Sequence, residues 1–147
     1  MSSTDIENSP ETEYAVDRQI GFMLRQASQR HVAIFTAMIG DKLTTTQWAA
    51  LIKLRQAGSC SQNQLGRETA MDVATIKGVV DRLVKRDFIR TEPDPNDGRR
   101  LVLSLTDQGR EAIDRNIAAA LAISEKTLQP LTSGERMMLI ELIRKIS

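Results

Sequence analysis

A run of turn-forming and cationic residues, Asp94 to Arg100, carries the clearest chemical signal in the chain. It lies between two β-prone runs, residues 88–91 and 101–105. Because proline and glycine favour the turn and the flanking apolar residues can pair, the run predicts a two-stranded hairpin with a cationic tip. A guanidinium at such a tip suits the negative potential of a DNA minor groove, and Asp97 is expected to orient Arg99 through a bidentate pair. A solvated charged loop is the alternative.

A helix-turn-helix pattern lies just upstream of this hairpin. Residues 61–64, Ser-Gln-Asn-Gln, form a capping box that opens a short helix to about Glu68, and Asp72 caps a helix over 73–86. The second helix of such a motif enters the major groove with its N-terminal residues against base edges. Its inward face is expected to be Ile76, Val79, Val80 and Leu83.

Candidate DNA contacts therefore come from the opening of the first helix, the outward face of the second and the hairpin tip. Small side chains allow close approach to bases, lysine can reach guanine or phosphate, and free helix amides suit phosphate. The set is Ser61, Gln62, Asn63, Asp72, Ala74, Thr75, Lys77, Gly78, Arg82, Arg86, Asp97, Arg99 and Arg100. The alternatives are helix capping alone for Ser61, intramolecular pairs for Arg82 and Arg86, and an ordinary solvent-facing helix.

Composition and charge agree with one helical, DNA-binding domain. The chain has 147 residues, 41% of them hydrophobic and only 3% aromatic, which favours an aliphatic helical core. The net charge is only +1, but residues 53–100 contain ten Lys or Arg against seven Asp or Glu. The positive excess thus lies on the segment expected to meet phosphate.

Four further segments have helical patterns. An apolar stripe with spacings of three and four residues predicts a long helix over 14–39. Capping boxes predict helices over about 44–56 and 132–146, and residues 106–107 open another that runs to about 128. The expected fold is mainly α with a small β-hairpin wing.

Four short motifs lie between the second helix of the helix-turn-helix and the helix after the hairpin: Val80-Asp81-Arg82-Leu83, Phe88-Ile89-Arg90, Asp97-Gly98-Arg99 and Leu105-Thr106-Asp107-Gln108-Gly109. With these motifs the chain resembles the MarR family of bacterial winged-helix regulators, from about Tyr14 to Ile146. One departure is Asp87, where the family more often has glycine.

The resemblance implies an obligate homodimer, usually a repressor, that binds a pseudo-palindromic operator in double-stranded DNA. It implies a helical dimerisation region over 13–43 and 106–147 and a winged helix-turn-helix lobe over 44–105. Residues 1–12, rich in Ser, Thr, Glu and Asn, are expected to be a mobile tail. The density of apolar residues over 137–146 independently predicts a partner surface.

The resemblance also implies that a small aromatic or phenolic carboxylate releases the protein from DNA, as in aromatic catabolism. The pocket would lie between the dimerisation region and the lobe, with polar groups among apolar walls. Candidates are Arg18, Phe22, Arg25, Gln29, His31, Trp48, Leu51 and Ile52. His31 with Arg25 or Arg18 would take the anionic end; alternatively His31 is a satisfied core or interface residue, and Trp48 a core anchor.

Other classes of function have less support. A redox-sensing repressor would use Cys60, the only cysteine, although a small buried thiol is the simpler reading. A winged-helix module that binds only proteins conflicts with the cationic tip. An enzyme is not expected: one His and one Cys supply no metal set, and no cofactor motif appears. The acidic N-terminus and the lack of a long apolar run predict a cytoplasmic protein.

Overall fold

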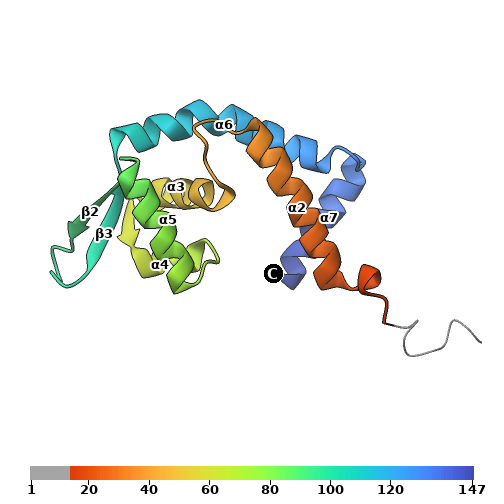
Figure 1. The fold of residues 1–147 in the computed structure, drawn as a ribbon, viewed down its shortest axis with the longest axis horizontal. Coiled ribbons are helices and arrows are strands. Elements are labelled where there is room, and N and C mark those ends of the chain that lie inside the picture. The colour runs from red at the N-terminus through yellow and green to blue at the C-terminus, as the bar shows by residue number, and fades with distance from the viewer. Residues whose placement is uncertain (1–13) are drawn as a thin grey trace, which may run out of the picture.

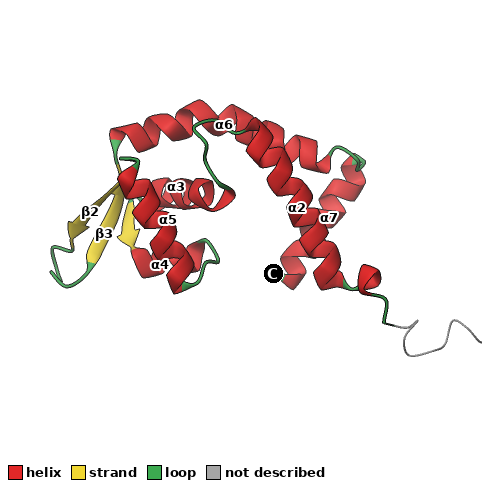
Figure 2. Ribbon diagram, in the orientation of Figure 1, coloured by secondary structure: helices red, strands yellow, loops and turns green. Residues whose placement is uncertain are grey.

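A computed structural model describes residues 14–147, so the predicted mobile tail over 1–12 lies outside the described residues. Figures 1 and 2 show a mainly helical molecule with a small sheet at one edge, and with α6 spanning it between the winged lobe and the end that holds α2 and α7. The elements are η1 (Val16–Arg18), α2 (Ile20–Met38), α3 (Thr45–Ala57), β1 (Ser59–Ser61), α4 (Gln62–Glu68), α5 (Val73–Lys85), β2 (Ile89–Pro93), β3 (Leu101–Leu105), α6 (Asp107–Leu128) and α7 (Ser133–Ile146).

The predicted first helix is shorter than expected. Its stripe was assigned to 14–39, but α2 begins at Ile20, because Gln19 has an extended backbone that separates it from the 3-10 turn η1. Near its middle α2 is hydrogen-bonded to α6. The Arg30 guanidinium donates to the carbonyl of Thr127 at 2.7 Å, near the negative end of the α6 dipole.

Side-chain caps start most of the later helices where the sequence predicted. Thr44 and Thr132 form complete capping boxes for α3 and α7. The third predicted box is wrong in part: Ser61 accepts from the Gln64 N–H, but the Gln64 amide donates to Glu68 at 3.1 Å instead of returning to the cap. Gln64 prefers a partner one turn along the same helix face.

The sheet has one strand more than the predicted hairpin. β2 and β3 pair antiparallel, from Ile89 opposite Leu105 to Pro93 opposite Leu101, and form the wing. β1 pairs with the other edge of β3 and places Cys60 opposite Leu103, which gives the order β1-β3-β2. The added strand ties the opening of the helix-turn-helix to the base of the wing.

The core lies in the winged lobe and is closed by the first half of α6. Leu51, Leu54, Leu65 and Leu83 are fully buried there, and Ile113 of α6 packs against them. α6 approaches the lobe closely at Gly109, where a Cβ atom would lie 2.2 Å from the carbonyl oxygen of Phe88. A side chain at this position would therefore push α6 off the lobe.

Asp87 shows how the lobe accommodates the departure from the family pattern. It ends α5 with a left-handed backbone, φ 62°, a conformation that favours glycine but that aspartate tolerates better than most residues. The Phe88 N–H donates to the Leu83 carbonyl at 2.9 Å, as in a glycine-ended helix. The helix end thus keeps its usual geometry with a non-glycine residue.

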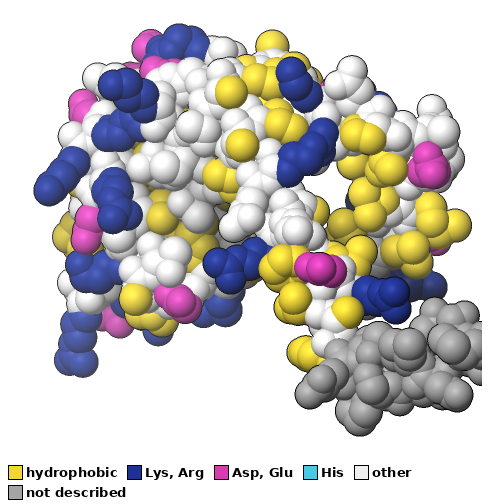
Figure 3. Space-filling view, turned by 45° about the vertical axis from the view of Figure 1, so that its right-hand side comes forward, with side chains coloured by type: hydrophobic (Ala, Val, Ile, Leu, Met, Phe, Trp, Pro, Cys, Tyr) yellow, Lys and Arg dark blue, Asp and Glu magenta, His cyan; other side chains and the backbone are white. Residues whose placement is uncertain are grey.

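The end of the molecule away from the lobe leaves apolar side chains uncovered. No residue of α7 is buried, and Met137 is 73% exposed. Figure 3 shows hydrophobic side chains gathered at this end, whereas Lys and Arg side chains gather over the lobe. Over residues 14–147, no helix has the length and hydropathy that a membrane span requires.

Candidate nucleic-acid interface

The recognition helix α5 presents its N-terminal turn to solvent, as predicted. Ile76, Val79, Val80 and Leu83 are buried, whereas Ala74, Thr75 and Lys77 are exposed. Gly78 is half-buried, because the exposed Arg82 guanidinium lies over it. The exposed side chains of Ala74 and Thr75 at this turn are small, which suits close contact with base edges.

Two polar residues of this helix are engaged within the protein. The Asp72 carboxylate accepts from the Thr75 N–H at 2.7 Å, and this backbone hydrogen bond holds the pKa of Asp72 below its ordinary value. Lys77 pairs with Asp81 at 2.9 Å on the exposed surface. An exposed pair of this kind is weak, so Lys77 can exchange Asp81 for phosphate or guanine at little cost. Asp72 acts as a cap for the helix.

Val73, the first residue of α5, was not among the predicted DNA contacts. It is 71% exposed although it is β-branched and apolar. No local sequence pattern marked it as exposed, because a position three residues before Ile76 shares the inward stripe by helical spacing. An exposed methyl pair here extends the surface that can touch a thymine methyl group.

A groove joins the opening of α4 to the wing. Its volume is about 430 Å³, and six of its seven lining residues are polar or cationic. The lining residues are Ser61, Gln62, Asn63, Arg67, Arg99, Arg100 and Leu101. The structure thus brings together five predicted residues from segments almost forty positions apart. Arg67 was missed, although it follows Asn63 by four residues and so shares its helix face.

The wing tip corrects one predicted pairing. Asp97 was expected to hold the side chain of Arg99, but its Oδ1 accepts from the Arg99 backbone N–H at 3.1 Å, and its Oδ2 lies 4.0 Å from Arg100 Nε. A two-residue separation in a tight turn brings the carboxylate to the backbone and not to the guanidinium. Among residues 14–147 the Arg99 guanidinium has no hydrogen-bond or ion-pair partner, so it is available to a ligand outside the protein.

Arg86 is the second correction. It was a candidate DNA contact, but it is half-buried and its guanidinium donates to the Asp41 carbonyl and to Gln47 Oε1. It also lies 4.7 Å from the centre of the Phe88 ring, in cation–π contact. The intramolecular alternative therefore holds for Arg86, which is turned away from the exposed face of α5.

The predicted ligand residues do not converge on one cavity. Leu51 is fully buried in the core and Trp48 packs against that core, so neither lines an open site. His31 Nδ1 lies 2.8 Å from Thr127 Oγ1, which makes it a satisfied contact between α2 and α6. Phe22 is half-buried near the start of α2, Arg25 and Gln29 of the same helix are exposed, and Arg18 is exposed in η1.

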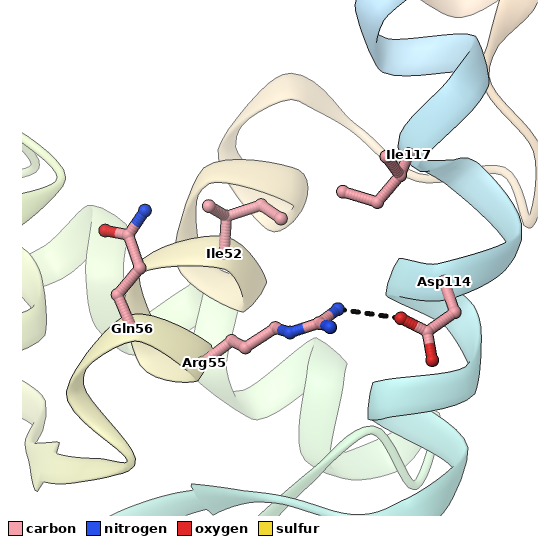
Figure 4. Close-up of a pocket in the computed structure, with 5 residues that line it drawn as sticks. All are labelled: Ile52, Arg55, Gln56, Asp114 and Ile117. Carbon is pink, nitrogen blue, oxygen red and sulfur yellow. Dashed lines mark hydrogen bonds and ion pairs between the residues drawn. The ribbon is translucent and has the colours of Figure 1, made fainter.

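Ile52, one of the predicted ligand residues, lines a cavity between α3 and α6. The cavity has a volume of about 570 Å³, and Figure 4 shows Ile52 and Ile117 on its opposite walls. Arg55 Nη1 lies 2.8 Å from Asp114 Oδ1 at its mouth. This cavity offers apolar walls and one cation, but apart from Ile52 its lining residues were not among the predicted ligand contacts. The two isoleucines are 65 positions apart, so no local pattern joined them.

Cys60 has the environment of a structural thiol. It is 6% exposed, and burial raises the pKa of the thiol, which the Glu68 carboxylate raises further. The reactive form is the thiolate, so both effects oppose oxidation.

Comparisons with known proteins agree with this geometry. The model of the MarR family matches residues 43–101. The transcriptional repressor NicR of Pseudomonas putida is 41% identical over 146 residues, 99% of this chain and 90% of NicR. The crystal structure of a probable transcriptional regulator from Pseudomonas aeruginosa is 52% identical, covers 90% of this chain and all of that one, and superposes with a TM-score of 0.88.

A third relative is BpsR of Bordetella bronchiseptica, described as a protein whose DNA binding is regulated by 6-hydroxynicotinic acid. It is 38% identical, with 90% of this chain and 96% of BpsR covered and a TM-score of 0.86. None of these three descriptions is that of an enzyme.

Proposed function

The chain belongs to the MarR family of winged-helix transcriptional regulators, and on that premise we propose that it represses transcription from a pseudo-palindromic operator until a hydroxylated aromatic carboxylate releases it. The observation that carries the DNA-binding half is the groove between α4 and the wing. In this groove the hydroxyl and amide side chains at the start of α4 lie together with three arginines, beside the exposed first turn of α5.

In this proposal each part of the lobe has one task on DNA. The first turn of α5 enters the major groove, where Ala74 and Thr75 meet base edges. The Arg99 guanidinium, which has no partner among residues 14–147, enters the adjacent minor groove. Ser61, Asn63 and Arg67 meet the phosphates between the two grooves.

A homodimer is proposed because two regions of the chain expose apolar side chains that nothing in one copy covers. These are residues of α2, among them Met23 and Leu24, and of α7, among them Met137 and Ile146. They fall in the segments 13–43 and 106–147, which we assign to dimerisation. Two copies joined there would present two α5 helices about one turn of DNA apart.

The cavity between α3 and α6 is the best-supported place for the effector. Ile52 and Ile117 could sandwich an aromatic ring, and Arg55 could exchange Asp114 for the carboxylate of the ligand. Because α3 belongs to the DNA lobe and α6 to the proposed dimerisation region, a ligand between them would bias the orientation of one to the other. The description of BpsR supports a hydroxynicotinic acid as the first ligand to test.

The test is fluorescence anisotropy with a labelled duplex from the intergenic region upstream of the gene, at two salt concentrations. We expect tight, salt-dependent binding that Arg99→Ala weakens about tenfold, with the salt slope reduced by about one. Arg110→Ala is the matched control, because Arg110 is an exposed arginine that pairs with Asp107 on α6. Binding that is insensitive to salt and to Arg99→Ala would overturn the proposal and favour a protein-binding module.

The effector is tested in the same assay. We expect 6-hydroxynicotinic acid to release the duplex, and nicotinic acid and benzoic acid, which lack the hydroxyl group, to be weaker. Arg55→Gln should shift the release curve to higher ligand concentration while leaving DNA affinity unchanged. Release that Arg55→Gln does not alter would move the effector site back to the α2 candidates, such as Arg25 and His31.

A further inference from the structure

A buried asparagine of α6 hydrogen-bonds the connection between α2 and α3. Asn116 is only 2% exposed, yet it satisfies its whole amide. Its Oδ1 accepts from the Gly40 N–H at 2.7 Å, and its Nδ2 donates to Asp41 Oδ2 at 2.7 Å and to the Ala112 carbonyl at 2.8 Å. A Cβ atom at Gly40 would lie 2.7 Å from Asn116 Oδ1, so the contact requires glycine at that position.

The recognition helix α5 hydrogen-bonds the same connection through the residue at its C-terminal end. Arg86 is the C-cap residue of α5, and its guanidinium donates to the backbone carbonyl of Asp41 and to Gln47 Oε1 at the start of α3. Its position over the Phe88 ring holds the guanidinium in place. Asp41 is therefore bonded through its side chain to α6 and through its carbonyl to α5.

Further contacts fix the conformation of Asp41 itself. Arg115 Nη2 donates to Asp41 Oδ1 at 3.1 Å, and this hydrogen bond is the main reason why the pKa of Asp41 lies below its ordinary value. The backbone of Asp41 and Lys42 is left-handed, with φ 57° and 49°. Two consecutive non-glycine residues in this region are costly and persist only where the surroundings hold them.

We propose that Asp41 is a positioning residue that sets the orientation of the recognition helix α5 to α6, through Asn116 on one side and Arg86 on the other. The inference rests on the proposed function, in which α6 belongs to the dimerisation region and two copies of α5 must match two half-sites. Hydrogen bonds have preferred directions, so a fully satisfied network restricts the angle between α5 and α6 more narrowly than apolar packing does. Asp41 then contributes to the half-site spacing that the dimer prefers in its operator, without contacting DNA.

The test separates orientation from contact. Binding is measured to duplexes that carry two half-sites at the natural spacing, to duplexes with one base pair inserted or removed, and to a duplex with a single half-site. The main variant is Asp41→Gly, because glycine tolerates the left-handed backbone and the substitution removes only the side chain. We expect affinity for the natural spacing to fall about tenfold, affinity for the single half-site to stay unchanged, and the preference among spacings to flatten.

Two more variants keep the proposal falsifiable if Asp41→Gly does not fold. Arg86→Lys retains the charge but loses the planar donor pair, and should also flatten the preference. Asp41→Asn retains an acceptor for Asn116 and the tolerance for a left-handed backbone, and should have the smaller effect. Asp107→Ala is the control, because it removes an exposed carboxylate whose ion pair with Arg110 lies within α6.

The outcomes are distinct. A dimeric, folded Asp41→Gly variant with the wild-type spacing preference overturns the proposal, as does an equal loss on full and single sites. Wild-type protein that binds none of the duplexes overturns the proposed function, and this inference with it.

Discussion

The winged lobe and the terminal helices are both rich in apolar residues, but they bury them differently. In the lobe, side chains from α3, α4, α5, the sheet and the first half of α6 close on one another, and Leu54 and Leu65 have no exposed surface. In α7, Ile140 is 43% exposed and no residue is buried. The packing of the lobe is thus complete within one chain, whereas that of α7 is not.

This difference indicates where the stability of each region comes from. A closed core stabilises the lobe at any protein concentration, whereas a surface covered by a second copy is stable only to the extent that the copies associate. The lobe can therefore keep its shape while the terminal helices respond to assembly. In a DNA-binding dimer, the lobe core would then fix the shape of each recognition surface, and the terminal helices would set the distance between the two surfaces.

The largest expected effect is on the closed core. Leu54→Ala should lower the free energy of unfolding by about 2–5 kcal/mol, because it removes a fully buried side chain and leaves a cavity. Urea denaturation measures the loss. Val73→Ala, at an exposed position of the same lobe, should change stability by less than about 0.5 kcal/mol. Equal losses for the two variants would contradict the contrast between core and surface.

Breaking the open surface should affect assembly instead. The double variant Ile140→Glu, Ile143→Glu places two charges on the apolar face of α7 and should yield monomers by sedimentation. Operator affinity should then fall about 10²-fold, since two linked half-site contacts become one. Glu141→Gln, on the same helix, is the control. A double variant that stays dimeric would show that α7 lies outside the dimer interface.

The two capping boxes offer a matched pair, one in each region. Thr44→Ala and Thr132→Ala each remove the side-chain acceptor that starts a helix, α3 or α7, and each should cost about 1 kcal/mol. We expect the first loss to appear in the urea unfolding of the lobe at every protein concentration. The second should appear as weaker dimerisation in sedimentation. The comparison fails if both losses appear in the same measurement.

The smallest effect is a pH dependence of the α7 cap. The Thr132 N–H donates to Glu135 and lowers the pKa of its carboxyl in the folded state. A carboxyl whose pKa is lower in the folded state than in the unfolded state stabilises the folded state at pH values above the unfolded pKa. This contribution is lost as the pH falls through the lowered pKa. Dimerisation measured from neutral into acidic pH should therefore weaken less steeply for Glu135→Gln than for wild type. Parallel curves would show that the carboxylate adds nothing.

Much of the lobe was predictable because its signals are local. The caps at Thr44 and Asp72, the inward stripe from Ile76 to Leu83 and the turn before Arg99 each depend on residues within one or two turns of chain. β1 was missed because three residues, Ser59–Ser61, are too short to show a period, and their pairing with β3 is set forty positions away. Asp97 was assigned the wrong partner because turn geometry, and not spacing, decides where its oxygens point.

The amino-acid sequence by itself thus determined the order of the α-helices and the wing, the inward face of the recognition helix, the cationic wing tip and the resemblance to the family. Only the tertiary structure decided which polar groups meet. Asp41 lies 45 positions from Arg86 and 75 from Asn116, and the three meet because α6 packs over the lobe at Gly109 and Ile113. Hydrogen bonds need atoms within about 3 Å in a defined direction, and over such separations only packing brings them there.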